Sequence, residues 1–131
     1  MDYRPVGIFD SGMGGLTAVR VLRELLPGED IAYLGDTARV PYGGRSVAEL
    51  IEIARSDALS PRAGDKAMLV ACGTVSSNCL DEVEKTAGVP VIGVVKPAAA
   101  GAAASTKTAA SACSPPWRQR APAPSCGSSR P

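Results

Sequence analysis

Short apolar segments and amphipathic segments alternate along most of this chain. Four mostly apolar segments, each next to a glycine or another turn former, lie at residues 6–10, 31–34, 67–71 and 91–95. Segments of this length and setting are typical of buried β-strands. The pattern therefore predicts four short strands separated by longer connections.

The connections carry helical patterns. Residues 16–26 repeat apolar side chains at spacings of three and four and end at Pro27-Gly28, which predicts an amphipathic helix of about three turns. A second helix is expected from Ser46 to about residue 58, with Ser46 as N-cap and Glu49 three residues later. A third is expected at 75–86, and the alanine-rich residues 98–104 predict the start of a fourth without an apolar face.

Strands that alternate with helices indicate right-handed parallel βαβ units. The predicted fold class is α/β, with a parallel sheet of about four strands and helices on both faces. In such sheets the strand-to-helix loops meet at the carboxyl edge, where ligands bind. We therefore expect the loops that contain Asp10-Ser11, residues 36–43 and Cys72-Gly73-Thr74 to lie together.

Composition narrows the function classes. The chain has 131 residues, 45% of them hydrophobic and 21% charged, with a net charge of +1, which predicts one globular domain and neither a nucleic acid nor a membrane partner. It has no histidine, so His-based catalytic pairs and the commonest metal ligand are excluded. Its four cysteines follow no zinc-ligand spacing, and no signal peptide is evident. We expect free thiols, a cytoplasmic location and no metal.

The last part of the chain differs from the rest. Residues 1–84 carry a charge of −5 and residues 85–131 carry +6. Residues 109–131 contain five Ala, five Ser and five Pro, and no Val, Ile, Leu, Met or Phe. Such a segment buries too little apolar surface to offset its ordering entropy. We predict an α/β domain at residues 1–108 and a disordered tail at 109–131.

Residue types in the three loops leave two interpretations open for each. Asp10 and Ser11 precede a glycine-rich turn and either bind an ammonium group or steer a proton, or simply cap a helix. The loop with Pro41, Tyr42 and Gly43 either presents backbone N–H groups to a carboxylate or is a rigid surface turn.

Cys72 ends a predicted strand just before a helix N-terminus, where the helix dipole favours a thiolate. Its alternative is a small buried apolar residue. Cys79 lies within the predicted third helix and is interpreted as a packing residue. Cys113 and Cys126 lie in the tail and receive no role.

Taken together, the motifs resemble glutamate racemase. The resemblance runs from about Val6 to Thr108 and is carried by GIFDSGMGGLT, YLGDTARVPYG, VACGT and PVIGV, in that order. It implies one half of a two-domain racemase fold, no cofactor, a glutamate substrate and a role in making D-glutamate for peptidoglycan. Members of this family are often homodimers.

The resemblance also implies roles for residues. In the family, one cysteine thiolate removes the α-proton of glutamate and a second thiol delivers a proton to the opposite face. Cys72 matches one of these thiols, and Asp10 matches the carboxylate that assists proton transfer and engages the substrate amino group. The matches for substrate binding are Asp10, Ser11, Pro41, Tyr42, Gly43, Gly73 and Thr74.

The chain departs from the family in three places. Gly73 stands where Asn is frequent, and Pro61 is expected to end the second helix early. The second domain, with the opposite cysteine, is missing. The DNA that encodes residues 109–129 allows a second reading. If GC-rich codons are assumed and the reading frame is moved back by one base, this DNA can encode the strand, loop and helix that come next in the family. We therefore expect a one-base frameshift near codon 108 and no activity from the chain alone.

Two other functions stay open at this point. A related amino-acid racemase, such as one for aspartate, shares the cysteine-based scaffold, although the motif DTARVPYG favours glutamate. A non-catalytic fragment that only associates with other proteins is the alternative outside the enzymes.

Overall fold

A computed structural model describes residues 2–58 and 64–106 of the chain. The predicted domain boundary at residue 108, the tail, Cys113, Cys126 and Pro61 lie outside these residues. The strands are β1 (Val6–Asp10), β2 (Ile31–Gly35), β3 (Ala67–Val70) and β4 (Val91–Gly93). The helices are α1 (Leu16–Leu25), α2 (Val47–Ile53), α3 (Gly73–Asn78), α4 (Leu80–Ala87) and α5 (Val95–Ser105), and a π-helical segment, η1 (Ala54–Ala58), continues α2.

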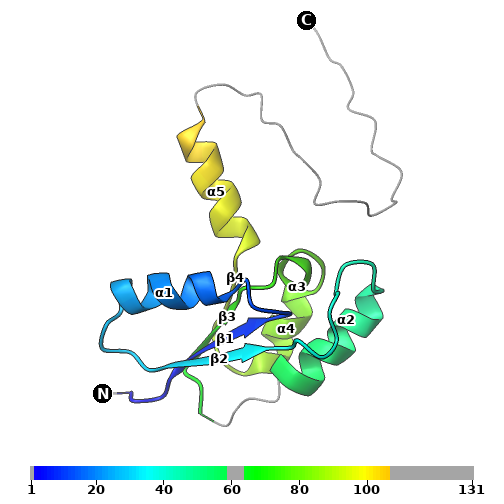
Figure 1. Cartoon of the computed structure of the whole chain (residues 1–131), viewed down its shortest axis with the longest axis horizontal. Helices are drawn as coiled ribbons and strands as arrows, with labels where there is room; N and C mark the ends of the chain where they lie inside the picture. The colour runs from blue at the N-terminus through cyan, green and yellow to red at the C-terminus, as the bar shows by residue number, and fades with distance from the viewer. Residues whose placement is uncertain (1, 59–63, 107–131) are drawn as a thin grey trace, which may run out of the picture.

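The four strands form one parallel sheet in the order β2-β1-β3-β4. Figure 1 shows α1 on one side of the sheet and α2 and α4 on the other. The predicted α/β class is therefore confirmed. The parallel order places the carboxyl ends of β1, β2 and β3 next to one another at one edge, as expected.

The main core lies on the face covered by α2, α3 and α4. It joins Phe9 of β1 and Val70 of β3 to Leu50 of α2, Val75 of α3 and Val83 of α4. Each of these side chains is almost completely buried. Burial of this kind contributes about 1.5–3 kcal/mol per large apolar side chain, so this face holds the carboxyl edge of the sheet in place.

The predicted start of α2 is confirmed in detail. The Ser46 hydroxyl accepts a hydrogen bond from the Glu49 N–H, and the Glu49 carboxylate accepts one from the Ser46 N–H, which forms a capping box. The last turn of the expected helix differs, because it is wound as the π-helix η1.

The second and third strands end one residue from their predicted ends, at Gly35 and Val70, and two larger differences concern other elements. The expected single helix at 75–86 is divided into α3 and α4 at Cys79, whose backbone leaves the helical region at φ −145°. The expected fourth strand at 91–95 ends at Gly93, because the Val94 N–H donates to the Ser76 hydroxyl instead of a strand neighbour and α5 begins at Val95. The helix expected at 98–104 is present and longer, as α5.

Apolar side chains remain exposed on the α1 side of the sheet. Val21 and Leu25 of α1 are 51% and 70% exposed, and Ile92 of β4 is 55% exposed. α5 buries no residue and extends away from the sheet (Figure 1). The half of this face formed by β3 and β4 is therefore poorly covered.

We expect this surface to cause self-association of the purified chain that increases with concentration. Leu25→Lys should weaken it, because it replaces an apolar side chain that is 70% exposed with a charged one. Glu24→Gln, on the polar side of α1, changes net charge by the same unit and should not. Sedimentation velocity over a concentration series measures the effect, and equal self-association of the two variants would contradict it.

Candidate active site

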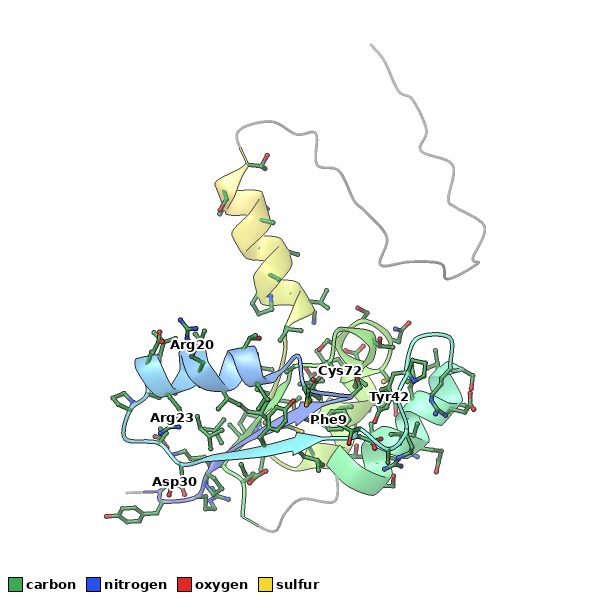
Figure 2. All side chains as sticks on the ribbon, viewed as in Figure 1. Phe9, Arg20, Arg23, Asp30, Tyr42 and Cys72 are labelled. Atoms are coloured by element: carbon green, nitrogen blue, oxygen red, sulfur yellow. The ribbon has the colours of Figure 1, made fainter. Side chains whose placement is uncertain are left out.

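The β1–β3 register brings Ser11 and Cys72 together. Phe9 pairs with Val70 across the two strands, and Ser11 and Cys72 each lie two residues further along. The Cys72 thiol donates to the Ser11 hydroxyl, with 3.3 Å between Sγ and Oγ. Figure 2 shows Cys72 near Phe9 and Tyr42, away from Arg23 and Asp30. Residues 61 positions apart thus meet where the sequence predicted.

Asp10 is a buried carboxylate held by main-chain and side-chain donors. Only 6% of it is exposed, and its Oδ2 accepts a hydrogen bond of 2.9 Å from the Gly15 N–H. A Cβ at Gly15 would lie 2.9 Å from the Cβ atoms of both Asp10 and Ala71. Glycine at this position therefore lets the turn pack closely against Asp10.

Cys72 is buried at the end of β3, with 3% of the residue exposed, and belongs to the core cluster. Gly73 and Thr74 follow it and begin α3, Gly73 exposed and Thr74 half-buried. The thiol therefore lies in a dry setting, with Ser11 as its hydrogen-bond partner. A base in such a setting is shielded from water, which suits the removal of a weakly acidic proton.

Cys79 has the packing role expected of it. It is buried at the junction of α3 and α4, and its thiol contacts the Val75 carbonyl at 3.6 Å. Burial, and secondarily the neighbouring Cys72, raise the pKa of the Cys79 thiol. Both cysteines are free thiols.

Tyr42 is held by its hydroxyl. The residue is 2% exposed, and the hydroxyl donates to Asp36 Oδ2 at 2.6 Å. Arg39 Nε lies 2.9 Å from the same oxygen. Burial, followed by the contact with Asp36, raises the pKa of Tyr42 far above its ordinary value. The hydroxyl is thus engaged within the protein, and a ligand would meet this loop through its main chain.

The main chain of this loop offers donors. Pro41 and Gly43 are exposed on either side of Tyr42. The Arg45 guanidinium donates to the carbonyl oxygens of Arg39 at 2.7 Å and Pro41 at 3.3 Å, which fixes the loop's shape. Among the described residues, neither the Tyr42 N–H nor the Gly43 N–H has a hydrogen-bond acceptor. Gly43 is exposed, so its main chain is open to a ligand such as a carboxylate, whereas Tyr42 is almost completely buried.

Tyr42→Phe tests the structural role of this hydroxyl. It removes the buried bond to Asp36 and should destabilise the chain by about 1–3 kcal/mol, because a buried carboxylate loses a donor. Urea unfolding measures the change. Tyr3→Phe, at a residue that is 83% exposed, is the matched control. Equal midpoints for the two variants would show that the Tyr42 hydroxyl contributes nothing to stability.

Sequence reasoning assigned no role to Tyr33 or Asp36. Tyr33 lies on β2 with its hydroxyl next to Asp10, and Asp36 follows β2 and is the partner of Tyr42. The signal for Asp36 was its place in the loop that follows a predicted strand, as for Ser11. Tyr33 carried no such signal, since its contact depends on β2 lying beside β1.

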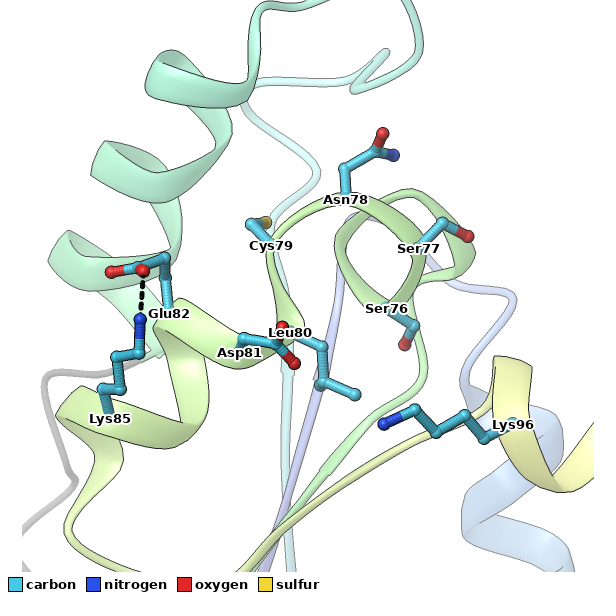
Figure 3. A pocket seen from close by; sticks show the side chains of 9 residues that line it. All are labelled: Ser76, Ser77, Asn78, Cys79, Leu80, Asp81, Glu82, Lys85 and Lys96. Carbon is cyan, nitrogen blue, oxygen red and sulfur yellow. Dashed lines mark hydrogen bonds and ion pairs between the residues drawn. The ribbon is translucent and has the colours of Figure 1, made fainter.

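A separate hollow of about 430 Å³ lies between α3, α4 and the start of α5 (Figure 3). Ser76, Asp81, Glu82, Lys85 and Lys96 are among its lining residues, and the Lys85 ammonium donates to Glu82 at 2.7 Å. Of the predicted site residues, none lines it. Across residues 2–58 and 64–106, no three Cys, Asp or Glu side chains gather to hold a metal ion.

Comparisons with known proteins give the site its context. The glutamate racemase of Chlorobaculum tepidum is 52% identical over 106 residues, covering 79% of this chain and 39% of that protein. This chain is a partial homologue of glutamate racemases. The solved structure of the Aquifex pyrophilus glutamate racemase matches it with a TM-score of 0.74 at 40% identity, covering 79% of this chain and 41% of that one.

A further glutamate racemase structure, from Francisella tularensis in complex with D-glutamate, matches with a TM-score of 0.68 at 45% identity over 73% of this chain and 37% of that one. The resemblance inferred from the motifs is therefore confirmed, and aspartate racemase is not favoured. No protein-family model matches the chain. The chain spans about two fifths of the length of these relatives.

Within the described part of the chain, no helix has the length and apolar character needed to cross a bilayer.

Proposed function

We propose that this chain supplies one half of a glutamate racemase active site, with Cys72 and Asp10 as its catalytic residues. The observation that carries the proposal is the convergence of Cys72, Ser11 and Asp10 at the carboxyl edge of the sheet in a homologue of glutamate racemases. Inversion at the α-carbon requires removal of a proton from one face and delivery of a proton to the other.

In the proposed reaction the Cys72 thiolate takes the α-proton of glutamate, and the C–H electron pair remains on the α-carbon. A second thiol, outside the part of the relatives that this chain matches, then protonates the opposite face. Asp10 engages the substrate amino group and assists proton transfer at Cys72. An α-carbon beside a carboxylate is only weakly acidic, so fixed donors must stabilise the developing charge.

The remaining predicted residues bind substrate in this proposal. The main chain of Gly43 receives a substrate carboxylate, on the loop that Pro41 and the buried Tyr42 form with it. Ser11, Gly73 and Thr74 lie on the two other loops at this edge and complete the binding surface. No metal or organic cofactor takes part. The reaction serves the cytoplasmic supply of D-glutamate for peptidoglycan.

A fusion protein tests the proposal. Residues 1–106 of this chain are joined to the part of the Chlorobaculum tepidum glutamate racemase that lies beyond its match. We expect the fusion to racemise both enantiomers of glutamate, followed by circular dichroism. A folded fusion that leaves both enantiomers unchanged would contradict the proposal.

We also propose that the racemase domain spans residues 1–108 and that residues 109–131 are translated out of frame. The match with the Chlorobaculum tepidum enzyme leaves about a fifth of this chain uncovered, in line with a tail of different composition. Sequencing the gene around codons 100–135 tests this. A confirmed reading frame, with no racemase-like sequence in the shifted frame downstream, would exclude it.

A further inference from the structure

Tyr33 lies against the catalytic carboxylate on the side formed by β2. Its hydroxyl donates to the Gly12 carbonyl at 2.8 Å and lies 3.3 Å from Asp10 Oδ2. The side chain is half-buried, and β2 is the direct neighbour of β1 in the sheet. We propose that Tyr33 is a positioning residue that holds the Asp10 carboxylate in place through its hydroxyl. The importance of Asp10 rests on the proposed function.

The number of available protons explains why this contact matters. A tyrosine hydroxyl has one proton and also accepts, whereas an ionised carboxylate and a carbonyl only accept. With Asp10 ionised, the hydroxyl proton can turn toward Oδ2. With Asp10 protonated, the hydroxyl donates to Gly12 and accepts from Asp10. Burial, and then the neighbouring Asp10, raise the pKa of Tyr33, so the hydroxyl keeps its proton at neutral pH.

Asp10 therefore has two fixed contacts on the same oxygen. The Gly15 N–H binds Oδ2 from the turn, and the Tyr33 hydroxyl approaches it from the neighbouring strand. A group that assists proton transfer changes its charge during the reaction. A hydroxyl that can both donate and accept lets the carboxylate keep its position as this happens.

The test uses the full 131-residue chain and hydrogen exchange measured by NMR. The Gly15 amide reports the contact with Asp10. The Leu16 amide, which donates to Met13, reports the same turn, and the Ala71 amide, which donates to Phe9, reports the sheet edge. In Tyr33→Phe we expect Gly15 exchange to rise roughly 3- to 10-fold relative to Leu16 and Ala71, as for the loss of one hydrogen bond.

The Asp10 ¹³Cγ resonance gives a second, spectroscopic readout and should move in Tyr33→Phe but not in Tyr3→Phe. Because the proposed effect runs through Asp10 Oδ2, Tyr33→Phe should raise Gly15 exchange by less in an Asp10→Asn background than in the natural sequence. Equal increases at Gly15 and Leu16 would show that Tyr33 only anchors the turn and would overturn the proposal. So would an unchanged Asp10 resonance, or an increase in Gly15 exchange that is just as large in the Asp10→Asn background.

This experiment needs no racemisation. Failure of the fusion protein with a positive exchange result would reject the proposed function and leave the contact between Tyr33 and Asp10 standing. An active fusion with a negative exchange result would support the proposed function and reject the positioning role of Tyr33.

Discussion

The purified 131-residue chain alone is expected to leave D- and L-glutamate unchanged in a circular dichroism assay. Inversion needs a second proton donor on the far side of the substrate, and the chain matches only about two fifths of its relatives' length. The predicted substrate-binding groups also lie at an open edge. Met13 and Val40, which lie on two of the loops there, are 70% and 50% exposed.

The fusion with the rest of the Chlorobaculum tepidum enzyme is the positive control for this result. Racemisation by the chain alone, abolished in Cys72→Ser, would contradict the expectation and show that one domain is sufficient. Racemisation that survives Cys72→Ser would instead indicate a contaminating enzyme, which a mock purification identifies.

Cys72→Ala should reduce racemisation by the fusion about 10²- to 10⁴-fold, the range expected for loss of a general acid or base. The thiol is at the end of β3 beside Ser11, with no histidine in the chain to replace it. The matched control is Cys79→Ala. It removes an equally buried thiol from the core, so we expect a stability loss with near-normal turnover of the folded fraction.

Initial rates at saturating glutamate, divided by the folded fraction from urea unfolding, separate these effects. A similar fall in rate for both variants would indicate that Cys72, like Cys79, is a packing residue. In that case Cys72 would be a small buried apolar residue, which is the alternative that its sequence position left open.

Much of the fold follows from local sequence. The start of β1 and the capping box at Ser46 depend on neighbouring residues and were predicted at the correct positions. The division at Cys79 was not, because no Gly or Pro marks it. The Cys79 N–H still donates to Val75, and the Cys79 carbonyl still accepts from Val83, so the helical pattern continues across the break.

The site was predictable to a similar extent. The meeting of Ser11 and Cys72 follows from parallel strands that end at one edge. The contact of Tyr33 with Asp10 depends on which strand lies beside β1, and local periodicity does not reveal that order. Tyr42 carried a ring and a hydroxyl in sequence, but its burial against Phe9 and its bond to Asp36 leave the exposed Pro41 and Gly43 as the parts of this loop that a ligand can meet.

The most direct test of the central claim is the exchange of the glutamate α-proton in D₂O, followed by ¹H NMR with the fusion and its Cys72→Ala variant. The wild-type fusion should replace the α-proton with deuterium while inverting either enantiomer. The variant should lose inversion and retain exchange with at most one enantiomer, through the remaining thiol. Inversion and exchange of both enantiomers at wild-type rates in Cys72→Ala would show that Cys72 does not transfer the α-proton.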